Sequence, residues 1–203
     1  SNTAIGSQSM NSNTTGFRNV AVGTFAMRNA TVGRDNTALG YAALQNTTGN
    51  SNTALGNIVL TANTTGGGNV GVGSRALNAN TTGNQNIAIG GQSSFSNKVG
   101  SENVSIGYRS LQNNDSSDNN TAVGAYSLFV TRQGENNTTL GKSALRNIDT
   151  SNNNTALGFA AGDNLLRGDQ NIIIGADIDF PNTIDTGQLN IGNIIYGVNV
   201  DGT

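Results

Sequence analysis

Several residue types that carry out protein chemistry are missing from this 203-residue sequence. It contains no cysteine and no histidine, and its only proline is Pro181. Without cysteine there is no disulfide framework and no thiolate chemistry. Without histidine the commonest general base and metal ligand is absent. Aromatic residues make up only 5% of the chain and hydrophobic residues 34%, a composition that argues against a conventional globular core.

Charge is also sparse. Charged residues make up 11% of the chain, and the formal net charge is −2. No basic run of the kind that neutralises phosphates is present, and there is neither a basic amphipathic face nor an apolar run long enough to span a bilayer. The sequence therefore predicts no nucleic-acid partner and no membrane insertion.

The chain is instead rich in asparagine and glycine, with 34 and 28 copies. In an aperiodic chain this bias would indicate disorder, but here it is strictly periodic. The phrase Asn154-Thr155-Ala156-Leu157-Gly158 recurs with little change along the whole sequence. Its closing residue, the repeat glycine, falls at Gly6, Gly23, Gly40, Gly56, Gly73, Gly90, Gly107, Gly124, Gly141, Gly158, Gly175 and Gly192.

The interval between repeat glycines is 17 residues, except for 16 between Gly40 and Gly56. The missing residue lies between Gln45 and Gly49, so it is expected to shorten a turn and to leave the strands in register. A period this strict predicts a stack of one structural unit, called a coil below. The repeat glycine is expected to need a positive φ or to allow close backbone approach between coils.

Asparagine stands four residues before the repeat glycine in eleven copies. These are Asn2, Asn19, Asn36, Asn52, Asn69, Asn86, Asn103, Asn120, Asn137, Asn154 and Asn171, and the twelfth copy has Gln188. If coils stack about 4.8 Å apart, these amides can bond to one another in a ladder. Alternatively, asparagine simply tolerates a tight corner. Both interpretations are structural.

Two apolar columns flank the repeat glycine. A medium-sized aliphatic residue always precedes it, as in Leu39 and Ile89, and is expected to point inward, with a small residue such as Ala38 just before it. A second column, four after the glycine, contains Met10, Met27 and mostly leucine thereafter. Each column is interpreted as a short strand, so that 17 residues supply two strands and two turns.

The predicted fold is therefore all-β: a parallel β-roll, or β-solenoid, of about 12 coils with a 17-residue period. Glycine and asparagine recur too densely for a helix. One coil contains only two or three sizeable apolar side chains. Their burial contributes little free energy compared with the conformational entropy that is lost when 17 residues are ordered. Oligomerisation is the expected remedy, with the small-residue face packing against copies of itself about an axis parallel to the solenoid. Residues 1–175 form the roll, and residues 176–203 a degenerate final coil, a cap or a transition to another module.

The stretch from Asn36 to Leu44, Asn-Thr-Ala-Leu-Gly-Tyr-Ala-Ala-Leu, resembles the head repeats of trimeric autotransporter adhesins. The segment from Gly187 to Gly197 is similar to one that precedes the self-cleaving intramolecular chaperone of phage tail fibres and tailspikes. The first resemblance covers nearly the whole chain and the second about eleven residues. Together they imply a left-handed roll wound as a homotrimer, located outside the cell on a virion tail fibre or a bacterial surface.

Few residues stand out as functional candidates. The carboxylates do not recur in phase as an acid and base pair, so no catalytic residue and no cofactor is predicted. Asp177 and Asp179 are weak candidates for Ca²⁺, against the simpler interpretation of solvated loop acids. Tyr41, Tyr108 and Phe159 directly follow a repeat glycine and could contact a receptor, or fill space between coils or chains.

The sequence thus predicts a non-enzymatic fibre segment that attaches to a cell-surface receptor or glycan. Two alternatives stay open. An ice-binding solenoid would need a flat threonine array, and the position three before the repeat glycine holds Thr3, Thr37, Thr53, Thr121, Thr138 and Thr155, interrupted by Val or Ile. A polysaccharide-cleaving tailspike would need carboxylates paired across chains in a groove, for which Asp177 and Asp179 are the candidates.

Overall fold

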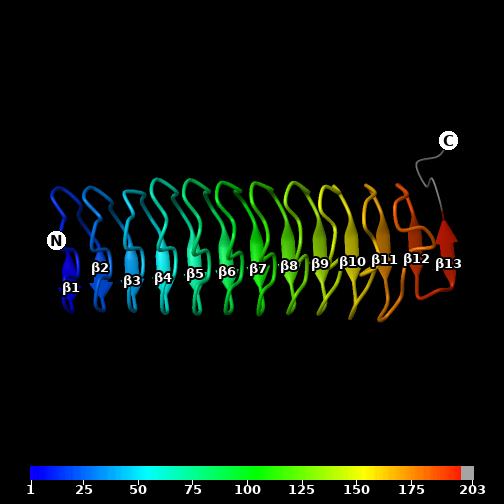
Figure 1. The fold of residues 1–203 in the computed structure, drawn as a ribbon, viewed down its shortest axis with the longest axis horizontal. Helices are drawn as coiled ribbons and strands as arrows, with labels where there is room; N and C mark the ends of the chain where they lie inside the picture. Colours follow the sequence, from blue (N-terminus) through cyan, green and yellow to red (C-terminus); the bar gives the residue numbers. More distant parts are fainter. Residues whose placement is uncertain (198–203) are drawn as a thin grey trace.

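The computed structural model describes residues 1–197, which form one elongated β-solenoid (Figure 1). Each strand has three residues. The strands are β1 (Thr3–Ile5), β2 (Val20–Val22), β3 (Thr37–Leu39), β4 (Thr53–Leu55), β5 (Val70–Val72), β6 (Ile87–Ile89), β7 (Val104–Ile106), β8 (Thr121–Val123), β9 (Thr138–Leu140), β10 (Thr155–Leu157), β11 (Ile172–Ile174), β12 (Leu189–Ile191) and β13 (Ile195–Gly197). They belong to a single sheet in chain order, and no helix occurs in the described residues.

Strands β1 to β12 are all parallel, and each pairs with the strand one coil later. The predicted fold class and period are therefore confirmed, with twelve parallel strands delimiting about eleven turns. The short coil keeps its register, since Thr37 pairs with Thr53 and Leu39 with Leu55. The missing residue is absorbed in a turn, as expected.

The prediction of a second strand in each coil is wrong. The segment after the repeat glycine consists of turns with positive φ two and four residues after it, for example 62° at Phe25 and 49° at Met27. It nevertheless stacks by backbone bonds, since the N–H of Met27 donates to the carbonyl of Ala43 at 2.9 Å. The neighbours Ala26 and Met27 are both fully buried, which an extended strand would not allow because its side chains alternate between faces.

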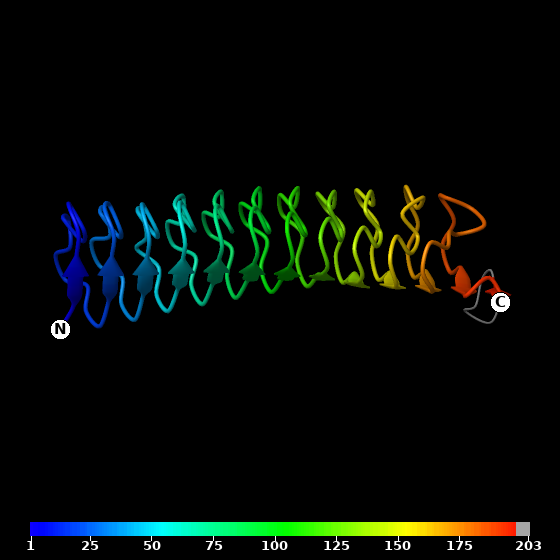
Figure 2. The same cartoon turned by 90° about the horizontal axis from the view of Figure 1, so that it is seen from below.

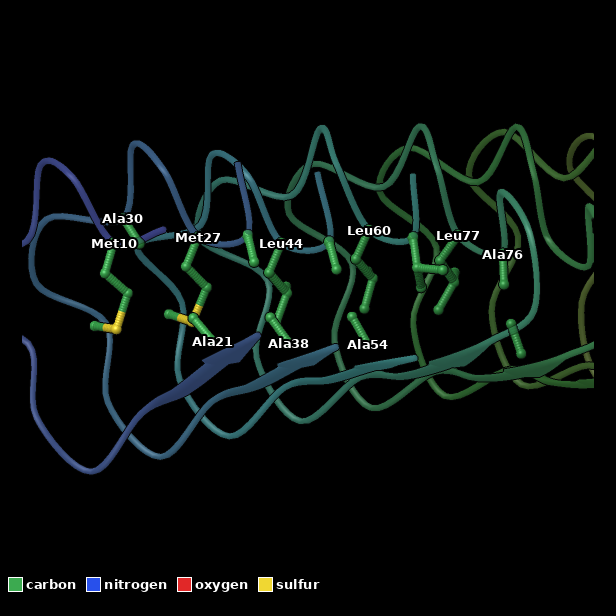
Figure 3. Close-up of a cluster of buried hydrophobic side chains, with 14 residues drawn as sticks. Met10, Ala21, Met27, Ala30, Ala38, Leu44, Ala54, Leu60, Ala76 and Leu77 are labelled. Atoms are coloured by element: carbon green, nitrogen blue, oxygen red, sulfur yellow. The ribbon is translucent and has the colours of Figure 1, made fainter. Parts of the chain in front are cut away.

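The predicted orientation of the strand is also wrong. From β2 onward the middle residue of each strand points inward, so that Ala38 is fully buried while Leu39 is 45% exposed. The aliphatic residue before the repeat glycine therefore lies outside, and the small-residue column lies inside. The physical reason is width. Met27, Leu44 and their equivalents project from the opposite wall of the coil and leave room only for a small side chain beneath them (Figure 3).

The apolar core runs the length of the rod but is interrupted once. One cluster extends from Met10 to Ala88 and a second from Leu111 to Phe180. Between them Ser94 occupies the position that leucine holds in neighbouring coils. Its hydroxyl lies 2.8 Å from that of Ser105, which also accepts a bond from Ser93 at 2.8 Å. A buried hydroxyl cluster thus separates two apolar segments.

The described part of the predicted C-terminal segment departs from the repeat. Strand β13 pairs antiparallel with β12 and ends the parallel stack. Phe180 is buried against Gly162, which occupies a leucine position, and Asn190 replaces the usual small residue and bonds to the carbonyl of Asp179 at 2.7 Å. Residues 198–203 lie outside the described residues. Within residues 1–197 no helix is long and apolar enough to cross a membrane.

Candidate interaction surfaces

The repeat glycines form a column in which each one lies against the next. Gly23 has a φ of 134°, and a Cβ there would lie 2.5 Å from the carbonyl oxygen of Gly40. A side chain would therefore both strain the backbone and collide with the coil above. The repeat glycines have this structural role and leave no side chain for chemistry.

The asparagine column is buried from Asn19 onward and bonds mainly to the backbone. The Oδ1 of Asn69 accepts from the backbone N–H of Asn86 at 2.9 Å, and its Nδ2 donates to the carbonyl of Gly83 at 2.8 Å. The direct amide contact, from Nδ2 of Asn69 to Oδ1 of Asn52, is longer at 3.2 Å. Each side chain therefore closes a corner of its own coil and also joins it to the next, so both interpretations of this column describe part of the structure.

A second polar column was not identified from the sequence. It lies seven residues after the repeat glycine and is buried at Asn63, Asn80, Asn97 and Asn114. The Nδ2 of Asn80 donates to Oδ1 of Asn63 at 2.8 Å, and that of Asn97 to Asn80 at 2.9 Å. The sequence does contain a pattern that could have identified this column, because asparagine recurs seven residues after the repeat glycine. The pattern is incomplete, since other coils have Ala30, Ile148 or Leu165 at that position.

The first and third residues of β1 to β12 form a continuous outward surface, which we call the outer sheet face. None of its residues is buried. The third position is always aliphatic, and Leu39, Leu55 and Leu140 are 45%, 43% and 52% exposed. The first position alternates irregularly between threonine and Val, Ile or Leu. Strands β1 to β12 lie along one side of the rod (Figure 2). Their outward residues therefore form two parallel rows of apolar and β-branched side chains on that side.

Tyr41, Tyr108 and Phe159 lie on another part of the surface and are 48%, 46% and 51% exposed. They do not meet one another, but two of them contact an aromatic ring of an adjacent coil. Tyr41 packs edge-on against Phe25, and Tyr108 against Tyr126, each at 5.6 Å between ring centroids. These rings therefore fill space between coils and still expose about half of their surface.

Asp177 and Asp179 are both exposed and lie near Asp163. Burial, followed by the charges of Asp179 and Asp177, raises the pKa of Asp163, while Arg146 opposes this rise. No group of three or more acidic, histidine or cysteine side chains within the described residues is placed to hold a metal ion. The geometry therefore offers no support for a Ca²⁺ site at Asp177 and Asp179.

Comparison of the chain with family models, curated protein sequences and solved structures finds no match. The surfaces of the solenoid are therefore the features that bear on its function. Of these, the outer sheet face is the most extensive, because it continues through every coil from β1 to β12.

Proposed function

We propose that this chain is a segment of a non-enzymatic extracellular fibre, in which three copies associate through their outer sheet faces. The observation that carries this proposal is the unbroken exposure of aliphatic side chains along β1 to β12. Soluble monomers rarely leave a contiguous apolar surface of this extent uncovered. Fully burying an exposed Val, Leu or Ile side chain contributes on the order of 1.5 to 3 kcal/mol, so covering these half-exposed aliphatic side chains contributes roughly half of that at each coil.

A second copy of the same chain is the occupant that fits this face best. A periodic surface meets its own period in a parallel copy, so that each coil faces an equivalent coil at the same height and no charge is buried. The resemblance to adhesin head repeats supports three copies about a shared axis. A rod of this kind is stiff because every coil is bonded to the next, and it can display repeated weak receptor contacts with high avidity.

The direct test is the native mass of the assembly. We expect the wild-type protein to have three times the 20.7 kDa mass of the chain. The variant Leu39→Lys/Leu55→Lys places two charges on the outer sheet face and should dissociate the assembly. Val32 and Val99 are similarly exposed apolar residues but lie near the turns, so Val32→Lys/Val99→Lys is the matched control and should leave the mass unchanged. A wild-type monomer would overturn the proposal.

Ice binding is a second candidate because Thr37, Thr53, Thr138 and Thr155 lie exposed in a row on the same face. Parallel strands repeat at about 4.8 Å, so the hydroxyls of Thr37 and Thr53, and those of Thr138 and Thr155, have this spacing within each pair, while Val or Ile begins three of the strands between the two pairs. The two functions compete for one surface. A monomer that shows thermal hysteresis, lost in Thr37→Lys/Thr53→Lys, would favour ice binding, whereas a trimer without thermal hysteresis would favour the fibre.

A further inference from the structure

Charge is segregated around the circumference of the coil. All six acidic residues before Asp163 lie eight to twelve positions after a repeat glycine, namely Asp35, Glu102, Asp115, Asp118, Glu135 and Asp149. Cations at those positions form ion pairs with some of them, as Arg132 does with Asp149 at 3.3 Å. That side of the rod is therefore close to neutral or slightly acidic.

The positions one, two and five after the repeat glycine have a different charge from the positions eight to twelve. Between Phe25 and Phe159 they carry five cations and no acid, and we call this strip the aromatic edge. Its cations are Arg28, Arg75, Arg109, Lys142 and Arg146. Its aromatic residues with ring contacts are Phe25, Tyr41, Tyr108, Tyr126, Phe129 and Phe159.

Contacts between cations and aromatic rings show that these three positions share one surface. Arg28 lies over the ring of Phe25 at 5.0 Å, and Arg109 over that of Tyr108 at 5.1 Å. Arg146 lies 5.5 Å from the ring centroid of Tyr126 and 5.6 Å from that of Phe129. The Nε of Arg109 also donates to Gln92 at 3.0 Å, which fixes its position. Tyr108, Arg109, Tyr126, Phe129 and Arg146 thus form one connected cluster.

We infer that the aromatic edge binds an acidic polysaccharide whose charges fall on alternate sugars. This inference rests on the proposed fibre function and specifies the chemistry of its receptor. Half-exposed rings such as Tyr108 offer apolar surface to the carbon–hydrogen face of a sugar, and adjacent guanidinium groups attract its carboxylate or sulfate. The strip ends at Asp163, the first acidic residue at these positions, which interacts electrostatically with Arg146.

The spacing of the cations favours a polysaccharide over a nucleic acid. Arg75, Arg109 and Lys142 are each two coils apart, which corresponds to about 10 Å along the rod. A nucleic-acid strand in a duplex carries one charge about every 3.4 Å, so most phosphates would face no cation. In a polymer in which acidic and neutral sugars alternate, successive charges are farther apart than in a nucleic acid. Such a spacing is closer to that of the cations on the aromatic edge.

Binding of hyaluronan, in which every second sugar carries a carboxylate, tests the inference. We expect the wild-type assembly to bind hyaluronan at low ionic strength and not to bind uncharged dextran. Arg109→Gln/Arg146→Gln should weaken binding by at least about tenfold, since each removes a charged contact. Arg34→Gln/Arg167→Gln removes the same charge near the turns and should change the affinity less than about twofold. Tyr108→Leu should weaken binding without changing the charge.

Three results would overturn the inference: no binding of hyaluronan by a correctly assembled protein, equal losses in both arginine double variants, or tighter binding of single-stranded poly-dT than of hyaluronan. The native mass of each variant is measured in parallel. A trimer that fails to bind hyaluronan would refute the receptor chemistry and leave the fibre intact. A monomer that binds it through Arg109 and Arg146 would refute the fibre and support the aromatic edge.

Discussion

At the scale of the residue, the buried asparagine side chains replace much of the bonding that longer strands supply in other sheets. Asn86 is 1% exposed, and its Oδ1 accepts the backbone N–H of Asn103 at 3.0 Å while its Nδ2 donates to the carbonyl of Gly100 at 2.8 Å. We expect Asn86→Ala to lower the free energy of unfolding by about 1 to 3 kcal/mol, because it leaves the buried N–H of Asn103 without a partner and removes one of the two bonds to the carbonyl of Gly100, the other being donated by Asn97. Chemical denaturation measures this loss. The control Asn57→Ala changes an exposed asparagine and should have little effect.

Glycine is required only at certain positions of the repeat. Gly107 has a φ of 133°, and a Cβ would lie 2.6 Å from the carbonyl carbon of Gly124. Gly107→Ala should therefore destabilise the fold by about 1 to 3 kcal/mol. Gly91 has no positive φ, and a Cβ there would meet Tyr108 at an ordinary 3.4 Å, so Gly91→Ala should be close to neutral. Thermal unfolding of the two variants beside the wild type measures the difference. Equal losses from both substitutions would contradict this assignment.

At the scale of the element, each coil is held by one three-residue strand and by a turn segment whose buried leucine reaches across to the strand. Ser94 interrupts this pattern but has a φ of 47°, close to the 48° of Leu77. Leu128 is fully buried at the equivalent position of its coil, although the middle residue of the next strand, β9, is the buried Thr139, which is larger than Ser105. We therefore expect Ser94→Leu to join the two core clusters and to raise the free energy of unfolding by about 1 kcal/mol. A decrease measured by denaturation would show that the hydroxyl cluster is stabilising.

The stability of the last coils is expected to depend on pH through Asp163. The pKa of Asp163 is raised in the folded state, so the folded protein holds this proton more tightly than the unfolded chain does. The contribution of Asp163 to stability therefore falls as the pH rises from the ordinary pKa of aspartate through the raised one, and stays low at neutral pH. Asp163→Asn should be more stable than the wild type at pH 7, and the difference should vanish in strong acid. A difference that grows on acidification would contradict the assignment.

At the scale of the whole molecule, the sequence predicted the architecture but not which side of the strand faces inward. The glycine period determined the parallel stack and its register, including the turn that absorbs the 16-residue interval. The orientation of Ala38 and Leu39 could not be deduced, because alternation shows that two faces exist without showing which one is buried. It is decided by Leu44 and its equivalents, whose positive φ turns them into the coil and leaves room opposite them only for a small side chain such as that of Ala38.

This inversion changes how the molecule is expected to assemble. The sequence assigned self-association to the small-residue column, whereas the structure buries that column inside each coil and exposes the aliphatic one. The grouping of cations and aromatic rings on the aromatic edge was also not predicted from the sequence. Tyr41, Tyr108 and Phe159 were recognised as a column, but the contacts of Arg109 and Arg146 with the aromatic rings depend on the curvature of the turn segment.

The proposed trimer places the outer sheet face of each copy against the same face of another, and the absence of native cysteine allows a direct measurement of this contact. Leu55→Cys introduces a single thiol on that face, at the end of β4. In an assembled fibre this thiol lies at the same height as its equivalents in neighbouring copies. Mild oxidation should therefore give a disulfide-linked pair of chains on a non-reducing gel, whereas Val32→Cys should not. A Leu55→Cys protein that stays a single chain and reacts freely with a bulky thiol reagent would contradict the account.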